Sequence, residues 1–417
     1  MSNQNLENTK NVLTFIQNED VFKTISKIIK DTSNLNLIEN LKDDRTIDDV
    51  IRNTPEIIML EIADSVKDEI SFIEEVNAIM PTTIIIAIFK ESNREQIQNV
   101  LLAGARAFCV QPLKRKDFQS TINRVIELQD RLIKSTLQIS TDDESEDKAH
   151  KTLIVFSPRG GVGTTTIASN LAIAIQNNSN KKTLLLDGKQ FFGHLDIFFN
   201  VMSRNNLLDL IPHLSELDQV LLDEVIVDHV SGIDLLLGPN SLPGAQGLHP
   251  ENYYSLVNIL QNIYEYIVID GGNSVTENTV TLLDVSQTIV LVINPDLASL
   301  KDARDFIGIC NSLTYPPEKL VVLLNNSGLR NSLDITEINK ALGREVFGVI
   351  PSEPGIAMDA INFGVPAFYR DKKRKFSRSI NKISKKMINY LEHSSSRKLK
   401  KDEKANLDLL DKSSRFG

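Results

Sequence analysis

Three glycines and three threonines within one short segment are the residues of this chain best suited to bind phosphate. The segment consists of Arg159, Gly160, Gly161, Val162, Gly163, Thr164, Thr165 and Thr166. An apolar run precedes it and a helical pattern follows it, a setting in which backbone N–H groups and a helix N-terminus cradle phosphate. The usual motif ends in Lys-Ser or Lys-Thr, and that lysine reaches the β- and γ-phosphates. Here Thr164 takes the lysine's position, so the sequence predicts a nucleotide site with altered chemistry.

Two more features place a metal near this loop. Asp270 ends the apolar run 266–269, and the end of a parallel strand faces the ligand crevice of such sheets. Thr165 stands where the usual motif has its magnesium-binding hydroxyl. We therefore expect both residues near Mg²⁺. The alternatives are that the glycines only form a tight turn and that Asp270 only caps its strand.

The elements that must position these residues follow an alternating strand and helix pattern. Such alternation predicts an α/β protein with two doubly wound parallel-sheet domains. We expect a first domain over residues 1–133, an acidic linker over 134–150, a second domain over 151–392 and a charged, disordered tail over 393–417. The predicted strands are 12–16, 57–62, 84–88, 107–110, 153–156, 183–186, 233–237, 266–270, 288–293 and 320–324.

Composition and charge limit the class of protein. The chain has 417 residues, a net charge of -9 and two distant cysteines, Cys109 and Cys310. This fits a reducing cytoplasm, and both cysteines read as packing residues. The chain opens with polar residues and contains no apolar run of about 20 residues, so we expect only peripheral membrane contact, at the inner face or a cell pole. Net acidity and the lack of a DNA-binding motif speak against DNA as a partner.

The second domain resembles the MinD/ParA superfamily of deviant Walker A ATPases. The resemblance rests on the glycine loop, on the strands that end at Asp187 and Asp270, on the strand before Asn325 and on the segment from Ile350 to Pro354. It implies ATP and Mg²⁺ as cofactors, with Asp187 near the metal. It also implies that Asn325 contacts adenine and that Pro351 lies in the base-capping loop. The alternative for Asn325 is an ordinary turn residue.

Within that superfamily the chain resembles the CpaE/TadZ branch of Flp (Tad) pilus-assembly proteins. The residues concerned are 190–196, 294–304 and the receiver-like first domain. The resemblance implies a cytoplasmic localisation and assembly factor for a pilus or secretion system. Its expected partners are the secretion ATPase and other Tad assembly proteins. The alternative is an active MinD/ParA-like ATPase that drives spatial positioning or partitioning.

Three substitutions bear on catalysis and dimerisation. A lysine at position 164 would make a charged contact to phosphate, and its replacement by Thr164 would weaken ATP binding by about 10–150-fold. Lys189 replaces the second Asp of the family's Asp-x-Asp pattern, which implies weak or absent hydrolysis. Lys189 itself is a candidate catalytic residue if it lies near the γ-phosphate, and otherwise points to solvent. Arg159 holds the position from which the family's signature lysine reaches the partner's nucleotide, which implies a homodimer formed as a nucleotide sandwich.

The first domain resembles a response-regulator receiver in pattern but not in chemistry. Its acidic pair falls on Gln17 and Asn18, its phosphoacceptor position on Glu61 and its lysine position on Gln111. These residues cannot assemble the metal and acyl-phosphate site, so we predict an unphosphorylatable interaction module. Glu61 is either a fixed mimic of the phosphorylated residue or a structural glutamate.

A basic amphipathic helix is predicted near the end of the second domain. Its apolar residues share one helical face, and basic residues surround that face. The apolar residues are Phe376, Ile380, Ile383, Met387 and Leu391. Such a helix can lie on anionic lipid, or it can pack on the sheet of its own domain.

Overall fold

The computed structural model describes residues 9–126 and 151–392. Short gaps interrupt these ranges at 33, 42–44, 64–65, 81, 92, 116–117, 120, 124, 218, 240–244 and 329–331. The predicted linker 134–150 and tail 393–417 lie outside the described residues. The chain divides into two compact units, one formed mainly by residues before 143 and the other mainly by those after it.

The first unit is a five-stranded parallel sheet in the order β2-β1-β3-β4-β5, which is the flavodoxin-like order. Its central strands β3 and β4 are almost wholly apolar and buried, as expected of a sheet covered on both faces. The elements are β1 (Lys10–Phe15), α1 (Glu19–Lys30), β2 (Leu35–Asn40), α2 (Ile47–Asn53), β3 (Ile57–Ile62), α3 (Lys67–Ile79), β4 (Ile84–Phe89), α4 (Arg94–Leu102) and β5 (Ala107–Val110).

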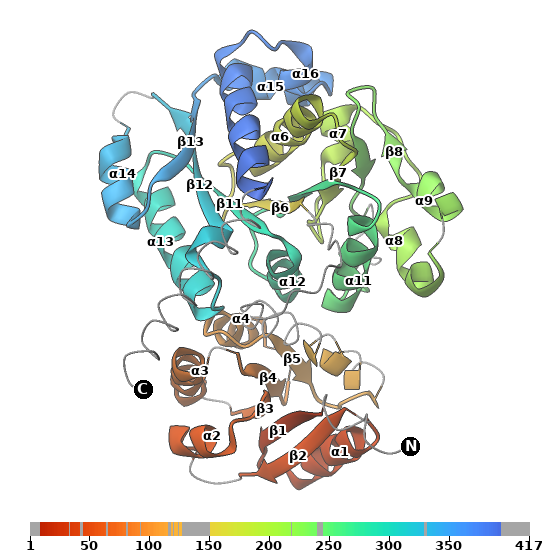
Figure 1. Ribbon diagram of the computed structural model, residues 1–417, viewed down its shortest axis with the longest axis vertical. Coiled ribbons are helices and arrows are strands. Elements are labelled where there is room, and N and C mark those ends of the chain that lie inside the picture. The colour runs from red at the N-terminus through yellow and green to blue at the C-terminus, as the bar shows by residue number, and fades with distance from the viewer. Residues whose placement is uncertain are drawn as a thin grey trace, which may run out of the picture. The chain divides into compact units, whose positions relative to one another are not determined.

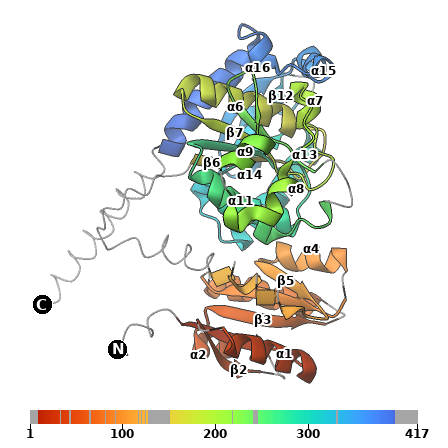
Figure 2. The ribbon, with the colours of Figure 1, turned by 90° about the vertical axis from the view of Figure 1, so that its right-hand side faces the viewer.

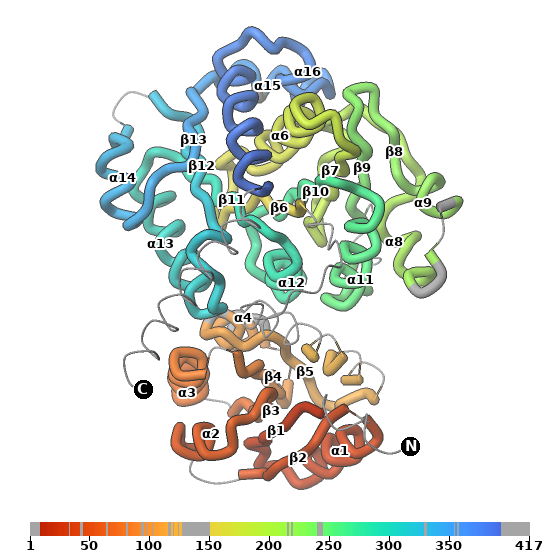
Figure 3. The backbone as a smooth tube through the Cα atoms, in the orientation of Figure 1, coloured from red at the N-terminus to blue at the C-terminus, as the bar shows by residue number. Residues whose placement is uncertain are grey.

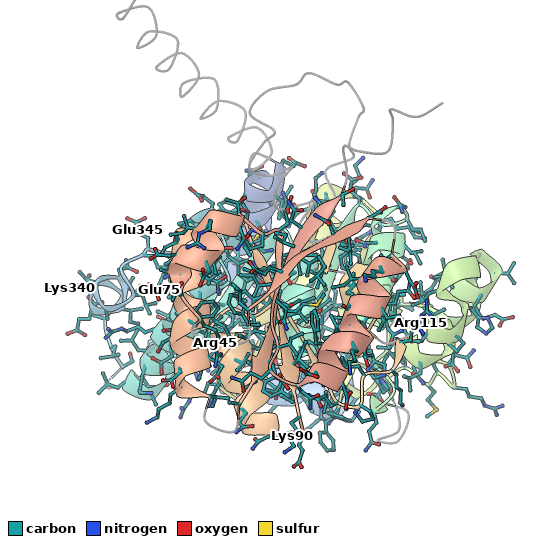
Figure 4. All side chains as sticks on the ribbon, turned by 90° about the horizontal axis from the view of Figure 1, so that it is seen from below. Arg45, Glu75, Lys90, Arg115, Lys340 and Glu345 are labelled. Carbon is teal, nitrogen blue, oxygen red and sulfur yellow. The ribbon has the colours of Figure 1, made fainter. Side chains whose placement is uncertain are left out.

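Two ion pairs tie peripheral segments of this unit to its helices. Arg45 meets the buried carboxylate of Glu69 in α3 at 2.8 Å. Arg115 meets Asp31, the residue that ends α1, at 2.6 Å. Figure 4 labels both arginines in a view of this unit from below. Both pairs join residues far apart in sequence and so brace the edges of the fold.

The second unit is an eight-stranded sheet in the order β13-β12-β11-β6-β10-β7-β9-β8. All its pairings are parallel except that of β8 with β9. Figure 2 turns the β8–β9 edge of this sheet toward the viewer. The strands are β6 (Lys151–Phe156), β7 (Thr183–Asp187), β8 (Val227–Asp228), β9 (Asp234–Leu236), β10 (Tyr266–Asp270), β11 (Thr288–Ile293), β12 (Leu320–Ser327) and β13 (Val346–Pro351).

Helices cover both faces of this sheet. Helix α6 packs against β6, β7 and β10, whereas α11 and α12 pack against β10 and β6 from the other face (Figure 1). The helices are α6 (Thr164–Ser179), α7 (Leu195–Phe199), α8 (Leu207–Leu210), α9 (Gln219–Val225), α11 (Pro250–Gln261), α12 (Glu277–Val285), α13 (Leu297–Ser312), α14 (Ile335–Leu342), α15 (Pro354–Phe363) and α16 (Ala367–Arg370), with 3₁₀ turns at Ile211–Glu216 and Pro317–Lys319. The predicted fold class is therefore confirmed for both units.

The basic amphipathic helix packs on its own domain. Residues 375–392 are helical, and the apolar face of this helix joins the core that α6 also enters. The five apolar residues are at most 6% exposed: Phe376, Ile380, Ile383, Met387 and Leu391. The apolar face is thus used in folding, which leaves only the basic back of the helix for contact with other molecules.

Candidate nucleotide-binding site

The glycine loop joins β6 to α6 at the centre of the second sheet, and its path can be followed in Figure 3. Gly161 and Gly163 have φ of 78° and 97°, a left-handed conformation that favours glycine. Helix α6 begins at Thr164, and the Gly163 carbonyl accepts its first hydrogen bond from Ile167 N at 2.9 Å. The free N–H groups of this first turn therefore face the loop, as phosphate binding requires.

Two asparagines, one in β12 and one after β10, lie against the glycine loop. Asn325, in β12, donates from Nδ2 to the Val162 carbonyl at 2.7 Å. A Cβ atom at Gly163 would lie 2.7 Å from that same Nδ2, and a Cβ atom at Gly160 would lie 2.9 Å from Asn273 Nδ2. Glycine is therefore favoured at Gly163 by both close approach and backbone angle, and at Gly160 by close approach. The contact of Asn325 with adenine stays a prediction. In this structure the Asn325 amide nitrogen donates its hydrogen bond to the glycine loop.

The remaining residues of the segment differ in exposure. Val162 is buried in the core, and Thr164 and Thr166 are each 8% exposed. Pro351 ends β13 and is half-buried. Their roles toward a nucleotide stay predictions.

Lys189 points into the site, so the expectation that it points to solvent is wrong. Its side chain is 16% exposed, and its Nζ lies 2.9 Å from Asp270 Oδ2. The same Nζ donates to Thr165 Oγ1 at 3.0 Å. The lysine thus joins the first turn of α6 to the end of β10.

Two glycines direct Lys189 to this position. Gly188 N donates to the Asp270 carbonyl at 3.0 Å, and a Cβ atom there would lie 2.7 Å from Ile269 Cγ2. A Cβ atom at Gly272, whose φ is 65°, would lie 2.7 Å from Lys189 Cγ. The absence of side chains at these two positions leaves the slot in which the lysine stem lies.

Asp187 lies deep beside this pair. It is 1% exposed, and its Oδ1 accepts from Lys189 N at 3.2 Å. Burial raises the pKa of Asp187 to about 7, the Asp270 carboxylate adds to the rise, and the Lys189 ammonium opposes it. A Cβ atom at Gly193 would lie 2.4 Å from Asp187 Oδ2, so the chain after β7 passes directly over this carboxylate.

The charge of Lys189 is secured by the same carboxylates. Burial alone would lower the pKa of Lys189, but Asp270 and Asp187 outweigh it and raise the pKa above its usual value. The side chain is therefore a permanent cation at neutral pH. A fixed positive charge stands between the phosphate loop and the end of β10.

Arg159 lies at the exposed mouth of the loop. Its side chain is 42% exposed, and Nη1 meets Asp302 of α13 at 3.2 Å. The Arg159 backbone N–H donates to Ser157 Oγ at 3.3 Å, which shapes the chain as it leaves β6. The guanidinium is thus accessible, and its ion pair with Asp302 lies at the surface.

The residues fit a phosphate chain better than a metal ion. The loop, the start of α6 and two nearby cations suit phosphate. In P-loop sites Mg²⁺ is held by the loop hydroxyl and a strand-end Asp. Here Lys189 Nζ contacts both groups, Thr165 Oγ1 and Asp270 Oδ2. Within the described residues, no group of three or more His, Cys, Asp or Glu side chains is arranged to hold a metal.

The predicted pseudo-site of the first unit also comes together. Glu61, in β3, accepts at Oε2 from the backbone N–H groups of Gln17 and Asn18 at 2.7 and 3.0 Å. Gln111 Nε2 lies 3.5 Å from Glu61 Oε1. Asn18 caps α1 by accepting from Asp20 N and Val21 N. The glutamate is therefore engaged with its own domain, which favours its structural role.

Sequence reasoning missed Asn273 and the two glycines that hold Lys189, Gly188 and Gly272. Two adjacent glycines and an asparagine follow Asp270, and one glycine follows Asp187. Small residues directly after a strand-end carboxylate are a signal that another chain segment passes close by. That signal was available, but it does not reveal which side chain fills the space.

Comparison with known proteins points to one superfamily. Residues 150–316 match the family model described as an AAA domain. The septum site-determining protein MinD of Thermotoga maritima is 26% identical over 222 residues, which cover 51% of this chain and 79% of that protein. A ParA family ATPase from Chlorobium tepidum superimposes with a TM-score of 0.54 at 25% identity, over 57% of this chain and 98% of that one.

A third protein shares the fold. The MinD protein of Pyrococcus horikoshii, solved with Mg-ADP, has a TM-score of 0.50 at 20% identity, over 56% of this chain and 94% of that one. Together these likenesses support the MinD/ParA superfamily for the second unit. Among the described residues, no helix is long and apolar enough to cross a membrane.

Proposed function

We propose that this chain is a dimeric, ATP-binding localisation and assembly factor for a Tad/Flp pilus or secretion system, with little or no ATP hydrolysis. The proposal rests on one observation, a phosphate loop with its glycines intact beside a lysine at the position of the second acidic residue. The phosphate loop keeps its glycines and helix start, while the position of the second acidic residue holds Lys189, locked to Asp270 at 2.9 Å. A lysine so held cannot accept a proton from water.

The pilus role rests on sequence segments. Residues 190–196 and 294–304 and the receiver-like first domain resemble CpaE/TadZ proteins. The flavodoxin-like strand order of the first unit supports a receiver-like module. Its partners would be the secretion ATPase and other assembly proteins, on the cytoplasmic side of the membrane.

Dimerisation through the nucleotide would use Arg159. Its guanidinium is exposed, and among the described residues its ion pair is with Asp302. An exposed ion pair contributes about 0–1 kcal/mol, so the arginine can leave it at little cost to reach a phosphate of the partner's nucleotide.

The second candidate is an active ATPase for spatial positioning or partitioning. The similarity to MinD and to a ParA family ATPase favours it. The two candidates differ in phosphate release and in the phenotype of a strain that lacks the protein.

ATP binding is tested with a matched pair of glycine variants. Gly163→Ala introduces a Cβ atom at positive φ that would lie 2.7 Å from Asn325 Nδ2. Gly343→Ala introduces one at φ 66°, at the end of α14, with no atom within 4 Å. Both cost about 1–2 kcal/mol of backbone strain. Calorimetry should show ATP binding lost only in Gly163→Ala, and equal binding in both variants would contradict the site.

The pilus role is tested in cells. A deletion strain should lose surface pili and regain them with the parent chain or Gly343→Ala, but not with Gly163→Ala. Normal pili together with defects in septum placement or plasmid inheritance would instead support the positioning ATPase.

A further inference from the structure

The Lys189 ammonium occupies the place where P-loop sites hold their metal. Its two partners are the loop hydroxyl of Thr165, at 3.0 Å, and the strand-end carboxylate of Asp270, at 2.9 Å. These are the two protein groups that such sites offer to Mg²⁺. We propose that Lys189 replaces the magnesium ion, so that this domain binds the phosphate chain of free ATP without Mg²⁺; this rests on the proposed ATP-binding function.

Mg²⁺ and the Lys189 ammonium cannot occupy this site together, because of both distance and charge. Mg²⁺ needs oxygen ligands at about 2.0–2.1 Å in near-octahedral order. The Lys189 ammonium lies 3.0 Å from Thr165 Oγ1 and 2.9 Å from Asp270 Oδ2, so it fills the space that such an ion would need, and its charge repels a second cation. The metal can enter only if Lys189 leaves.

The lysine is built into this place. Its stem lies against Gly272, where a Cβ atom would come within 2.7 Å of Lys189 Cγ, and only 16% of the side chain is exposed. Gly188 lets the chain cross the end of β10. Two buried carboxylates, Asp187 and Asp270, surround the charge. If the Lys189 side chain moved away, neither carboxylate would keep its contact with the lysine charge.

The lysine also has donor capacity left for phosphate. An ammonium carries three N–H donors, and Lys189 Nζ donates one of them to Thr165 Oγ1 while it pairs with the Asp270 carboxylate by charge. A remaining donor can meet a phosphate oxygen, which returns to the site a positive charge that Thr164 does not supply. Because Mg²⁺ in solution binds ATP and lowers its negative charge, the metal competes with the protein for the ligand.

The test is calorimetric titration of ATP into the full chain, with EDTA and with excess MgCl₂. The parent chain should bind ATP at least as tightly in EDTA as in MgCl₂. Lys189→Met should reverse this order, with binding about tenfold or more tighter in MgCl₂, because the metal can then reach Thr165 and Asp270. Lys301→Met is the control, since Lys301 is exposed on α13 and forms an ion pair with Asp305 on the same helix.

A second variant keeps every charge. Gly272→Ala displaces the Lys189 stem and should also make binding depend on Mg²⁺, even if Lys189→Met does not fold. The electron paramagnetic resonance of Mn²⁺ with nucleotide-free protein should show bound metal in these variants and none in the parent.

The outcomes separate the two proposals. Tighter ATP binding by the parent in MgCl₂ than in EDTA would overturn the magnesium replacement and leave ATP binding intact. Binding in neither condition would overturn the proposed function and this inference with it.

Discussion

At the scale of single residues, Lys189 and Arg159 decide what the second unit can do with a nucleotide. Lys189 is half-buried and contacts Thr165 and Asp270, whereas Arg159 is exposed and forms a surface ion pair with Asp302. The first therefore acts as a fixed charge within one subunit. The second is free to serve another subunit at little cost.

Arg159→Ala should strongly reduce ATP-dependent dimer formation while leaving the fold of the monomer intact. Removing one partner of a charge pair in a partly desolvated interface costs about 2–5 kcal/mol. Arg159→Lys should be milder, because charge is kept although the fork is lost. Sedimentation with and without ATP measures both, and Asp302→Ala controls for loss of the surface pair. If Arg159→Ala dimerises as well as the parent, the dimer does not use the nucleotide sandwich.

The contacts of Glu61 lead us to expect that small phosphodonors do not phosphorylate the first unit. Its carboxylate is already engaged by Gln17 N and Asn18 N, and no lysine stands at Gln111. Acetyl phosphate with Mg²⁺ should therefore leave the intact mass of the protein unchanged. A phosphoryl adduct that disappears in Glu61→Gln would show that the pseudo-site is a working receiver.

At the scale of elements, the sequence predicts every central strand and misses three of the four edge strands. Strands β3, β4, β10 and β11 are continuous apolar runs, because both faces of a parallel sheet are covered. The three strands not predicted, β2, β8 and β13, all lie at sheet edges and are half-exposed. An edge strand need not be apolar on both sides, so its pattern resembles a loop.

The helix over residues 375–392 shows where pattern alone left two alternatives. Periodicity gave its apolar face, but only the packing against α6 shows what covers that face. Its role in folding predicts that Ile380→Ala lowers the free energy of unfolding by about 2–5 kcal/mol. Lys382→Ala, on the exposed back, should change it by about 0.5 kcal/mol or less. Urea unfolding of the full chain measures both, and equal small effects would mean that the helix is not part of the core.

The site itself could be predicted in part. Each motif lies at or follows the carboxyl end of a parallel strand, and these ends meet at one edge of the second sheet. The structure brings together there the glycine loop, Asp187, Asp270 and Asn325. The position of the Lys189 ammonium could not be predicted, since it depends on the space left by Gly188 and Gly272. Contacts of this kind arise from tertiary packing and carry no fixed sequence spacing.

At the scale of the whole molecule, we propose a nucleotide-dependent scaffold. In this proposal a receiver-like module that cannot be phosphorylated precedes a P-loop unit that binds phosphate but lacks the acid expected to position water. The resemblance to MinD and ParA proteins leaves an active ATPase as the rival account. Binding and turnover on the same sample separate the two.

The central claim is that the chain binds ATP without hydrolysing it at a useful rate. The most direct measurement is phosphate release from ATP by the purified full chain, under conditions where calorimetry shows the site to be filled. The account predicts a filled site and phosphate release no faster than that of Asp270→Asn. Rapid release by the parent chain that is lost in Asp270→Asn would contradict it.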